Sequence, residues 1–79
     1  MSVLDGVKEI INEVLDIPLE EINLESNLTD DLKADSLDIV EMLMQMEDKF
    51  GLHIPESAAE NLKTVKDVVE YLEKRLQEK

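Results

Sequence analysis

A single serine near the middle of the chain has the surroundings that most favour chemistry. Ser36 lies between Asp35 and Leu37, where an acidic segment meets the start of an amphipathic helix. Serine is a preferred N-cap residue, so capping alone accounts for its position. The free N–H groups and the positive dipole end of a helix N-terminus also favour a phosphate ester there. A capping role and a phosphate ester are both compatible with the sequence.

Ser36 lacks a partner that would make it a catalytic nucleophile. His53 is the only histidine in the chain, and a helix from Ser36 to Phe50 would hold the two about 20 Å apart at about 1.5 Å per residue. A serine hydroxyl with no base in reach is not activated. We therefore predict that the chain is not an enzyme and has no catalytic residue, and that any modification of Ser36 is made by another enzyme. His53 is interpreted as an ordinary loop residue.

The candidate metal ligands are wrongly spaced for a metal site. Met42, Met44 and Met46 are two residues apart, so on a helix their sulfur atoms cannot converge on one ion. Met42 and Met46 are expected in the core instead. An acidic cluster lacks the spacing and the central glycine of a calcium-binding loop, so it is interpreted as a solvated face. Its members are Asp30, Asp31, Asp35 and Asp38. No metal site is predicted.

The composition narrows the classes of partner. The 79 residues include 20 acidic and 8 basic side chains, for a formal net charge of -12, and no cysteine. Nucleic acid and anionic membranes are disfavoured, because both attract clustered Lys and Arg. A partner with a basic patch is favoured. Without cysteine, any thiol that this chain uses must come from a cofactor.

The length suits one domain, residues 1–79. Residues 1–6 lack the basic region and apolar run of a secretory signal, and no stretch approaches the roughly 20 apolar residues of a membrane span. We expect a cytoplasmic monomer without membrane insertion.

Hydrophobic periodicity predicts an all-α fold, a small four-helix bundle of three longer helices and one short one. Helices are expected over 3–15, 36–50 and from 65 onward, with the short helix over 55–62. A long loop over 16–35 separates the first two helices. Isolated apolar residues are expected to hold this loop to the core: Ile17, Ile22, Leu24, Leu28 and Leu32.

Turn and capping signals mark the ends of these elements. Pro18 favours a short turn after the first helix, and Gly51 favours the end of the second. Ser2 with Asp5 has the spacing of a capping box, and so does the pair that precedes the last helix, Thr64 with Asp67.

One stripe of the predicted helix 36–50 mixes apolar and acidic side chains. At about 100° per residue, Leu37, Glu41, Met44 and Asp48 share a face. This face is opposite the one formed by Ile39, Met42, Leu43, Met46 and Phe50. Because the stripe starts beside Ser36, we interpret it as a docking surface.

Several segments resemble the acyl carrier protein family. The run LKADSLDIVE at 32–41 is similar to the family's attachment motif, and the resemblance continues through EDKFG at 47–51, IP at 54–55, LKTV at 62–65 and EYL at 70–72. It covers nearly the whole chain. One departure is Lys33, which stands where the family usually has glycine; if that position needs a positive φ, lysine there is strained.

The resemblance implies a function and a set of site residues. It implies that Ser36 carries 4'-phosphopantetheine, donated by coenzyme A through a phosphopantetheinyl transferase, and that the arm's thiol carries acyl groups. The implied partners are enzymes of fatty acid biosynthesis such as ketosynthase, acyltransferase, reductase and dehydratase. Recognition residues would be Asp35, Leu37, Asp38, Glu41, Met44 and Asp48. Residues lining the acyl chain would be Phe50, Ile54, Ala59, Leu62 and Val68.

Two alternatives stay open on the sequence. The chain could be a specialised carrier of polyketide, D-alanyl or other cargo. It could also be an unmodified acidic helical adaptor that binds one basic partner.

Overall fold

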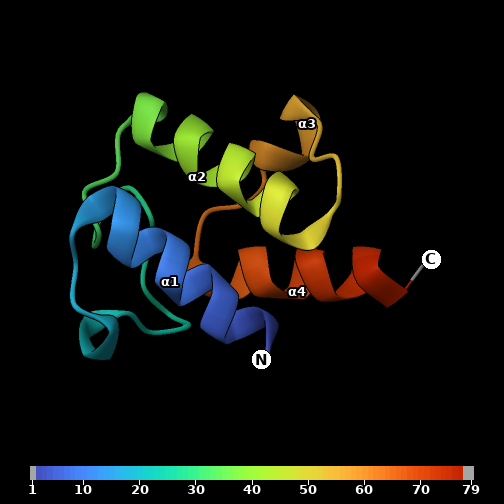
Figure 1. The fold of residues 1–79 in the computed structure, drawn as a ribbon. Coiled ribbons are helices and arrows are strands. Elements are labelled where there is room, and N and C mark those ends of the chain that lie inside the picture. Colours follow the sequence, from blue (N-terminus) through green and yellow to red (C-terminus); the bar gives the residue numbers. More distant parts are fainter. Residues whose placement is uncertain (1, 78–79) are drawn as a thin grey trace.

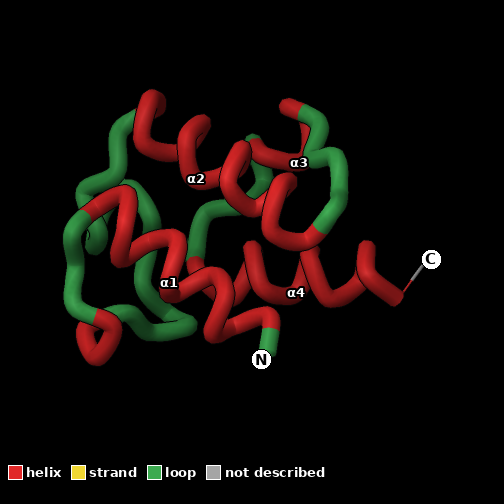
Figure 2. The backbone as a smooth tube through the Cα atoms, viewed as in Figure 1, coloured by secondary structure: helices red, strands yellow, loops and turns green. Residues whose placement is uncertain are grey.

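The computed structural model describes residues 2–77, so the outermost residues of the predicted domain 1–79 lie outside the described part. The elements are α1 (Val3–Leu15), a 3-10 turn η1 (Leu19–Glu21), α2 (Ser36–Phe50), α3 (Glu56–Ala59) and α4 (Val65–Gln77). Three longer helices, one short helix and a long loop between α1 and α2 confirm the predicted fold class (Figures 1 and 2).

Helix α1 packs against both α2 and α4. It contributes Val7, Ile10 and Ile11 to the core, and α2 contributes Met42 and Met46, which are fully buried as predicted. Burying an apolar side chain of this size stabilises the fold by about 1.5–3 kcal/mol. The contribution of α4 is Val65, Val68, Val69 and Leu72. The core therefore holds α2, which carries Ser36, against α1.

The long loop 16–35 is tied to the start of α4. Three of its predicted apolar anchors, Ile22, Leu28 and Leu32, are buried. Leu24 is exposed, contrary to prediction, and its backbone carbonyl, which accepts from the Lys66 N–H at 2.9 Å, joins it to α4. Neighbouring backbone bonds join the loop to 63–65, so the segment that leads into α2 is ordered.

Local capping explains where most helices begin and end. The Asp5 N–H donates to Ser2 Oγ at 3.1 Å, which is one of the two bonds of the predicted capping box. Gly51 ends α2 in the left-handed conformation at φ 67°, which suits glycine. The short helix was predicted over 55–62, but it spans only Glu56–Ala59. After Glu60 the chain continues through tighter turns, in which the Leu62 N–H donates to the Ala59 carbonyl three residues before it.

Within the described residues, each helix is too short or too polar to cross a membrane.

Candidate functional site

Ser36 is the first residue of α2 and is exposed. The N-cap of α2 is Asp35, so Ser36 does not have the capping role that its residue type and position allowed. The Asp38 N–H donates to Asp35 Oδ1 at 2.9 Å, and the Asp35 N–H donates to Asp38 Oδ2 at 3.2 Å. These two bonds form the capping box of α2 without a serine hydroxyl. Ser36 is therefore placed at the positive end of the helix dipole with its hydroxyl outside the cap.

The segment 27–34, which precedes the start of α2, is held by hydrogen bonds within itself. Asn27 Oδ1 accepts from the N–H groups of Thr29 and Asp30, both at 2.9 Å. The Ala34 N–H donates to the Leu28 carbonyl at 2.9 Å, and Ala34 is buried. Lys33, one residue earlier, has a φ of 62°. Lys33 therefore adopts the left-handed backbone conformation that glycine tolerates, and it carries the strain expected for lysine at that position.

A groove of about 690 Å³ lies between α2 and residues 54–63, and Ser36 is one of its lining residues. We call it the α2–α3 groove. Its apolar lining comes from α2 on one side and from the 54–63 segment on the other: Ile39, Val40, Leu43, Met44, Ile54, Ala59 and Leu62. Polar residues of the loop, of α2 and of the 54–63 segment complete it: Asn27, Thr29, Asp30, Glu47, Glu56, Glu60 and Lys63. A group attached to Ser36 would therefore have an apolar surface beside it.

Only part of the predicted acyl-chain lining meets in this groove. Ile54, Ala59 and Leu62 line it, whereas Phe50 and Val68 do not. The Phe50 ring packs on α1, where Gly6 makes room for it: a Cβ on Gly6 would lie 2.7 Å from Phe50 Cζ. Val68 is buried in the core on α4. Three of the five predicted lining residues thus lie in the α2–α3 groove, and the other two lie outside it.

The groove also contains residues that sequence reasoning assigned elsewhere. Ile39 and Leu43 were expected on the core face of α2, and both are half-buried because they stand between the core and the groove. Met44 was expected on the docking stripe; it is 59% exposed and also lines the groove. Helical periodicity could have placed these side chains beside the core, but it gives no sign of a groove.

The predicted docking stripe is exposed along its length. Leu37 is 79% exposed, and Glu41 and Asp48 are exposed as well. Val40, which the sequence analysis did not select, adds a further exposed apolar side chain to this part of α2. Two exposed carboxylates thus accompany three exposed apolar side chains on the helix that begins with Ser36.

Acidic side chains do not converge into a metal site in the described part of the chain. Within residues 2–77, no group of three or more His, Cys, Asp or Glu side chains is arranged to hold a metal ion. Asp35 and Asp38, two members of the predicted acidic face, are instead engaged in the cap of α2.

A small helical domain with an exposed serine at a helix start, beside an apolar groove, has the form of a phosphopantetheine-bearing carrier domain. Residues 5–72 match the family model described as a phosphopantetheine attachment site. The chain is 55% identical over 73 residues to an acyl carrier protein of Amoebophilus asiaticus, covering 92% of this chain and 91% of that one. It is 47% identical over 73 residues to an acyl carrier protein of Wolinella succinogenes, covering 92% and 96%.

A solved structure agrees with these sequence relatives. The structure of a putative acyl carrier protein from Mycobacterium tuberculosis superposes with a TM-score of 0.79 at 31% identity, covering 85% of this chain and 89% of that one. The chain belongs to the acyl carrier protein family, a family of non-catalytic carriers with a 4'-phosphopantetheine prosthetic group.

Proposed function

We propose that Ser36 is the attachment residue and that its 4'-phosphopantetheine arm carries acyl groups as thioesters. The observation that carries this assignment is the position of Ser36: it is exposed at the start of α2, its hydroxyl is outside the Asp35–Asp38 cap, and it lines the α2–α3 groove. The helix N-terminus stabilises a phosphodiester at this place. The arm supplies the thiol that the cysteine-free chain lacks.

The α2–α3 groove is the shelter for an attached acyl chain. Its apolar lining on both sides suits an unbranched aliphatic chain, and Ile54, Ala59 and Leu62 form the wall opposite α2. Burial of each CH₂ group stabilises such a complex by up to about 0.8 kcal/mol. A domain of 79 residues has a small core, so this contribution is a large share of its stability.

Partner enzymes dock on α2 next to Ser36. Leu37 and Met44 supply apolar contact, and Glu41 and Asp48 attract a basic patch, with Asp35 and Asp38 at the helix start. The formal net charge of -12 favours rapid encounter with basic partners. A phosphopantetheinyl transferase is the first such partner. If the pathway is fatty acid biosynthesis, the later partners are ketosynthase, acyltransferase, reductase and dehydratase. The protein meets them as a monomer in the cytoplasm.

In vitro labelling tests the attachment site. A phosphopantetheinyl transferase with coenzyme A and Mg²⁺ should add one arm to the wild-type protein and none to Ser36→Ala. Ser57→Ala is the matched control, because Ser57 is also exposed and helical but lies in α3; it should be labelled fully. Labelling of Ser36→Ala, or its loss in Ser57→Ala, contradicts the assignment.

A further inference from the structure

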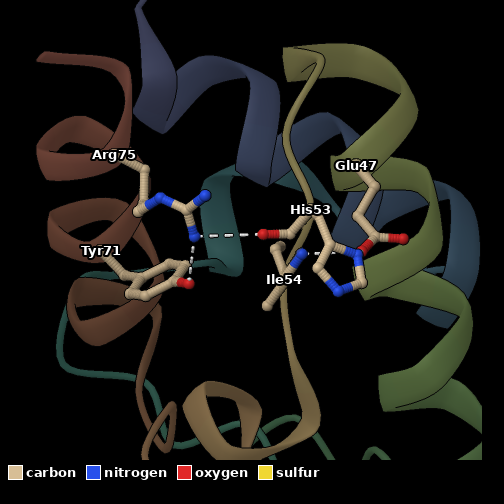
Figure 3. A network of polar contacts seen from close by, with 5 residues as sticks. All are labelled: Glu47, His53, Ile54, Tyr71 and Arg75. Atoms are coloured by element: carbon tan, nitrogen blue, oxygen red, sulfur yellow. Dashed lines mark hydrogen bonds and ion pairs between the residues drawn. The ribbon is translucent and has the colours of Figure 1, made fainter. Parts of the chain in front are cut away.

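The peptide group that joins His53 to Ile54, just beyond α2, is hydrogen-bonded at both its carbonyl and its N–H. The two partners are side chains of two different helices. The carbonyl oxygen, on His53, accepts from Arg75 Nη1 of α4 at 3.1 Å. The N–H, on Ile54, donates to Glu47 Oε2 of α2 at 2.7 Å. Figure 3 shows the two side chains reaching this peptide from opposite sides.

Both anchoring side chains are themselves held in place. Glu47 Oε2 also lies 3.2 Å from His53 Nδ1, and the Glu47 carbonyl accepts from the Gly51 and Leu52 N–H groups at the end of α2. Arg75 Nη1 donates to the Tyr71 hydroxyl at 2.8 Å, and the guanidinium lies 5.8 Å from the centre of the Tyr71 ring (Figure 3). Tyr71 packs on the hydrophobic core. The peptide is thus tied to the two helices that pack on α1.

The tied peptide borders the α2–α3 groove. Ile54 lines the groove and is only 7% exposed, and Glu47 is itself a lining residue. The next residue, Pro55, begins the α3 segment, which is a single turn with no side-chain hydrogen bond at its start. The well-anchored His53–Ile54 peptide is therefore followed by the α3 segment, a part of the groove wall with fewer side-chain anchors.

We propose that the His53–Ile54 peptide is a fixed hinge at the start of the 54–63 wall of the groove, and that Glu47 and Arg75 are its positioning residues. The inference rests on the proposed function of the groove. Both side chains hold Ile54 against the groove, and this sets how closely the 54–63 wall covers the chain. Loss of either anchor lets that wall move away and leaves the thioester and its chain more open to solvent.

The hinge itself can be tested without any cargo. Hydrogen exchange of the Ile54 amide should accelerate at least about tenfold in Glu47→Ala, because a hydrogen bond to a charged group is worth more than the about 1.4 kcal/mol that corresponds to a tenfold change. Arg75→Ala should accelerate the same amide by a smaller factor, because it frees the carbonyl end only. Glu73→Ala and Lys74→Ala, which change exposed neighbours on α4, are the matched controls and should leave this amide unchanged. Unchanged exchange in Glu47→Ala overturns the hinge.

The effect on cargo is measured by thioester cleavage. Hydroxylamine should cleave the octanoyl form of the wild-type holo protein more slowly than the acetyl form, because the longer chain is sheltered. In Glu47→Ala and Arg75→Ala the octanoyl rate should approach the acetyl rate, which itself stays unchanged. Glu47→Gln and Arg75→Lys, which keep a hydrogen-bonding group, should restore part of the protection. They also give the same test if an alanine variant does not fold.

Two failures are distinguishable in this experiment. If the wild type shows protection and all four variants keep the same octanoyl-to-acetyl ratio, the positioning role is wrong while the groove's function stands. If octanoyl and acetyl thioesters of the wild type are cleaved equally, or Ser36 cannot be loaded, the groove has no sheltering function and the inference falls with it.

Discussion

Asp35 and Asp38 cap the first turn of α2 reciprocally, each accepting the backbone N–H of the other. The residue between them that carries the proposed cofactor, Ser36, is therefore not needed to satisfy the helix end. Because capping and modification fall to different residues, esterification of the serine hydroxyl removes no capping bond of α2.

The first prediction compares these neighbours. Asp35→Ala should lower the free energy of unfolding by about 1 kcal/mol, the usual cost of a lost N-cap. Ser36→Ala should change it by less than about 0.5 kcal/mol, as exposed substitutions usually do. Urea unfolding of both variants beside the wild type measures the difference. A larger loss in Ser36→Ala than in Asp35→Ala would show that the serine hydroxyl is the cap in solution.

The second prediction concerns Lys33, which has a φ of 62°. A non-glycine residue in the left-handed conformation destabilises the folded state by about 1–2 kcal/mol. Glycine avoids this strain, but it also makes the unfolded chain more flexible, which cancels part of the gain in stability. Lys33→Gly should therefore stabilise the protein by about 0.5 kcal/mol. Lys33→Ala is the control, since it removes the charge but keeps the strain. An equal gain in both variants would assign the effect to charge rather than to the backbone.

The third prediction uses the cap of α4. The backbone N–H groups of Thr64 and Lys63 donate to Asp67 Oδ2, and they hold the pKa of Asp67 below its ordinary value of 3.8. A carboxyl whose pKa is lowered on folding adds stability above its unfolded pKa and loses it as the pH falls through the folded one. The stability difference between wild type and Asp67→Asn should thus be constant above pH 3.8 and shrink below it. Chemical unfolding at several pH values measures it; a difference that does not change below pH 3.8 contradicts the assignment.

The fourth prediction tests docking on α2. Glu41→Lys should slow association of the holo protein with a ketosynthase and weaken its salt dependence, because an exposed carboxylate steers encounter. Met44→Ala should mainly accelerate dissociation, because it removes desolvated apolar contact. Binding kinetics at several salt concentrations separate the two effects. Wild-type kinetics in both variants would place the docking surface elsewhere.

Local sequence signals predicted most of the fold because they act over three or four residues. Apolar periodicity located α1, α2 and α4, and Gly51 ended α2 as expected. The same signals did not settle the cap of α2, because Asp35 and Ser36 are both good N-cap residues. Asp38, three residues after Asp35, was the signal that could have decided between them.

The groove depends on contacts between distant residues, which periodicity does not encode. Phe50 was predicted among the residues that line the acyl chain, and its ring lies on α1 in the space that Gly6 leaves, outside the α2–α3 groove. The hydrogen bond from Arg75 to the His53 carbonyl joins residues 22 positions apart, and no spacing pattern in the sequence predicts it. Packing of the helices decides both features.

The mass of the intact protein, purified from its own host, tests the central claim most directly. The proposed function predicts one 4'-phosphopantetheine arm on the wild-type chain, with or without an acyl group, and the mass of the unmodified chain for Ser36→Ala. The acyl group, where present, identifies the cargo: a straight saturated chain supports fatty acid biosynthesis, and a polyketide or aminoacyl group a specialised carrier. An unmodified wild-type chain, in a host whose other carriers are modified, would contradict the claim and favour an adaptor that binds a basic partner without any cofactor.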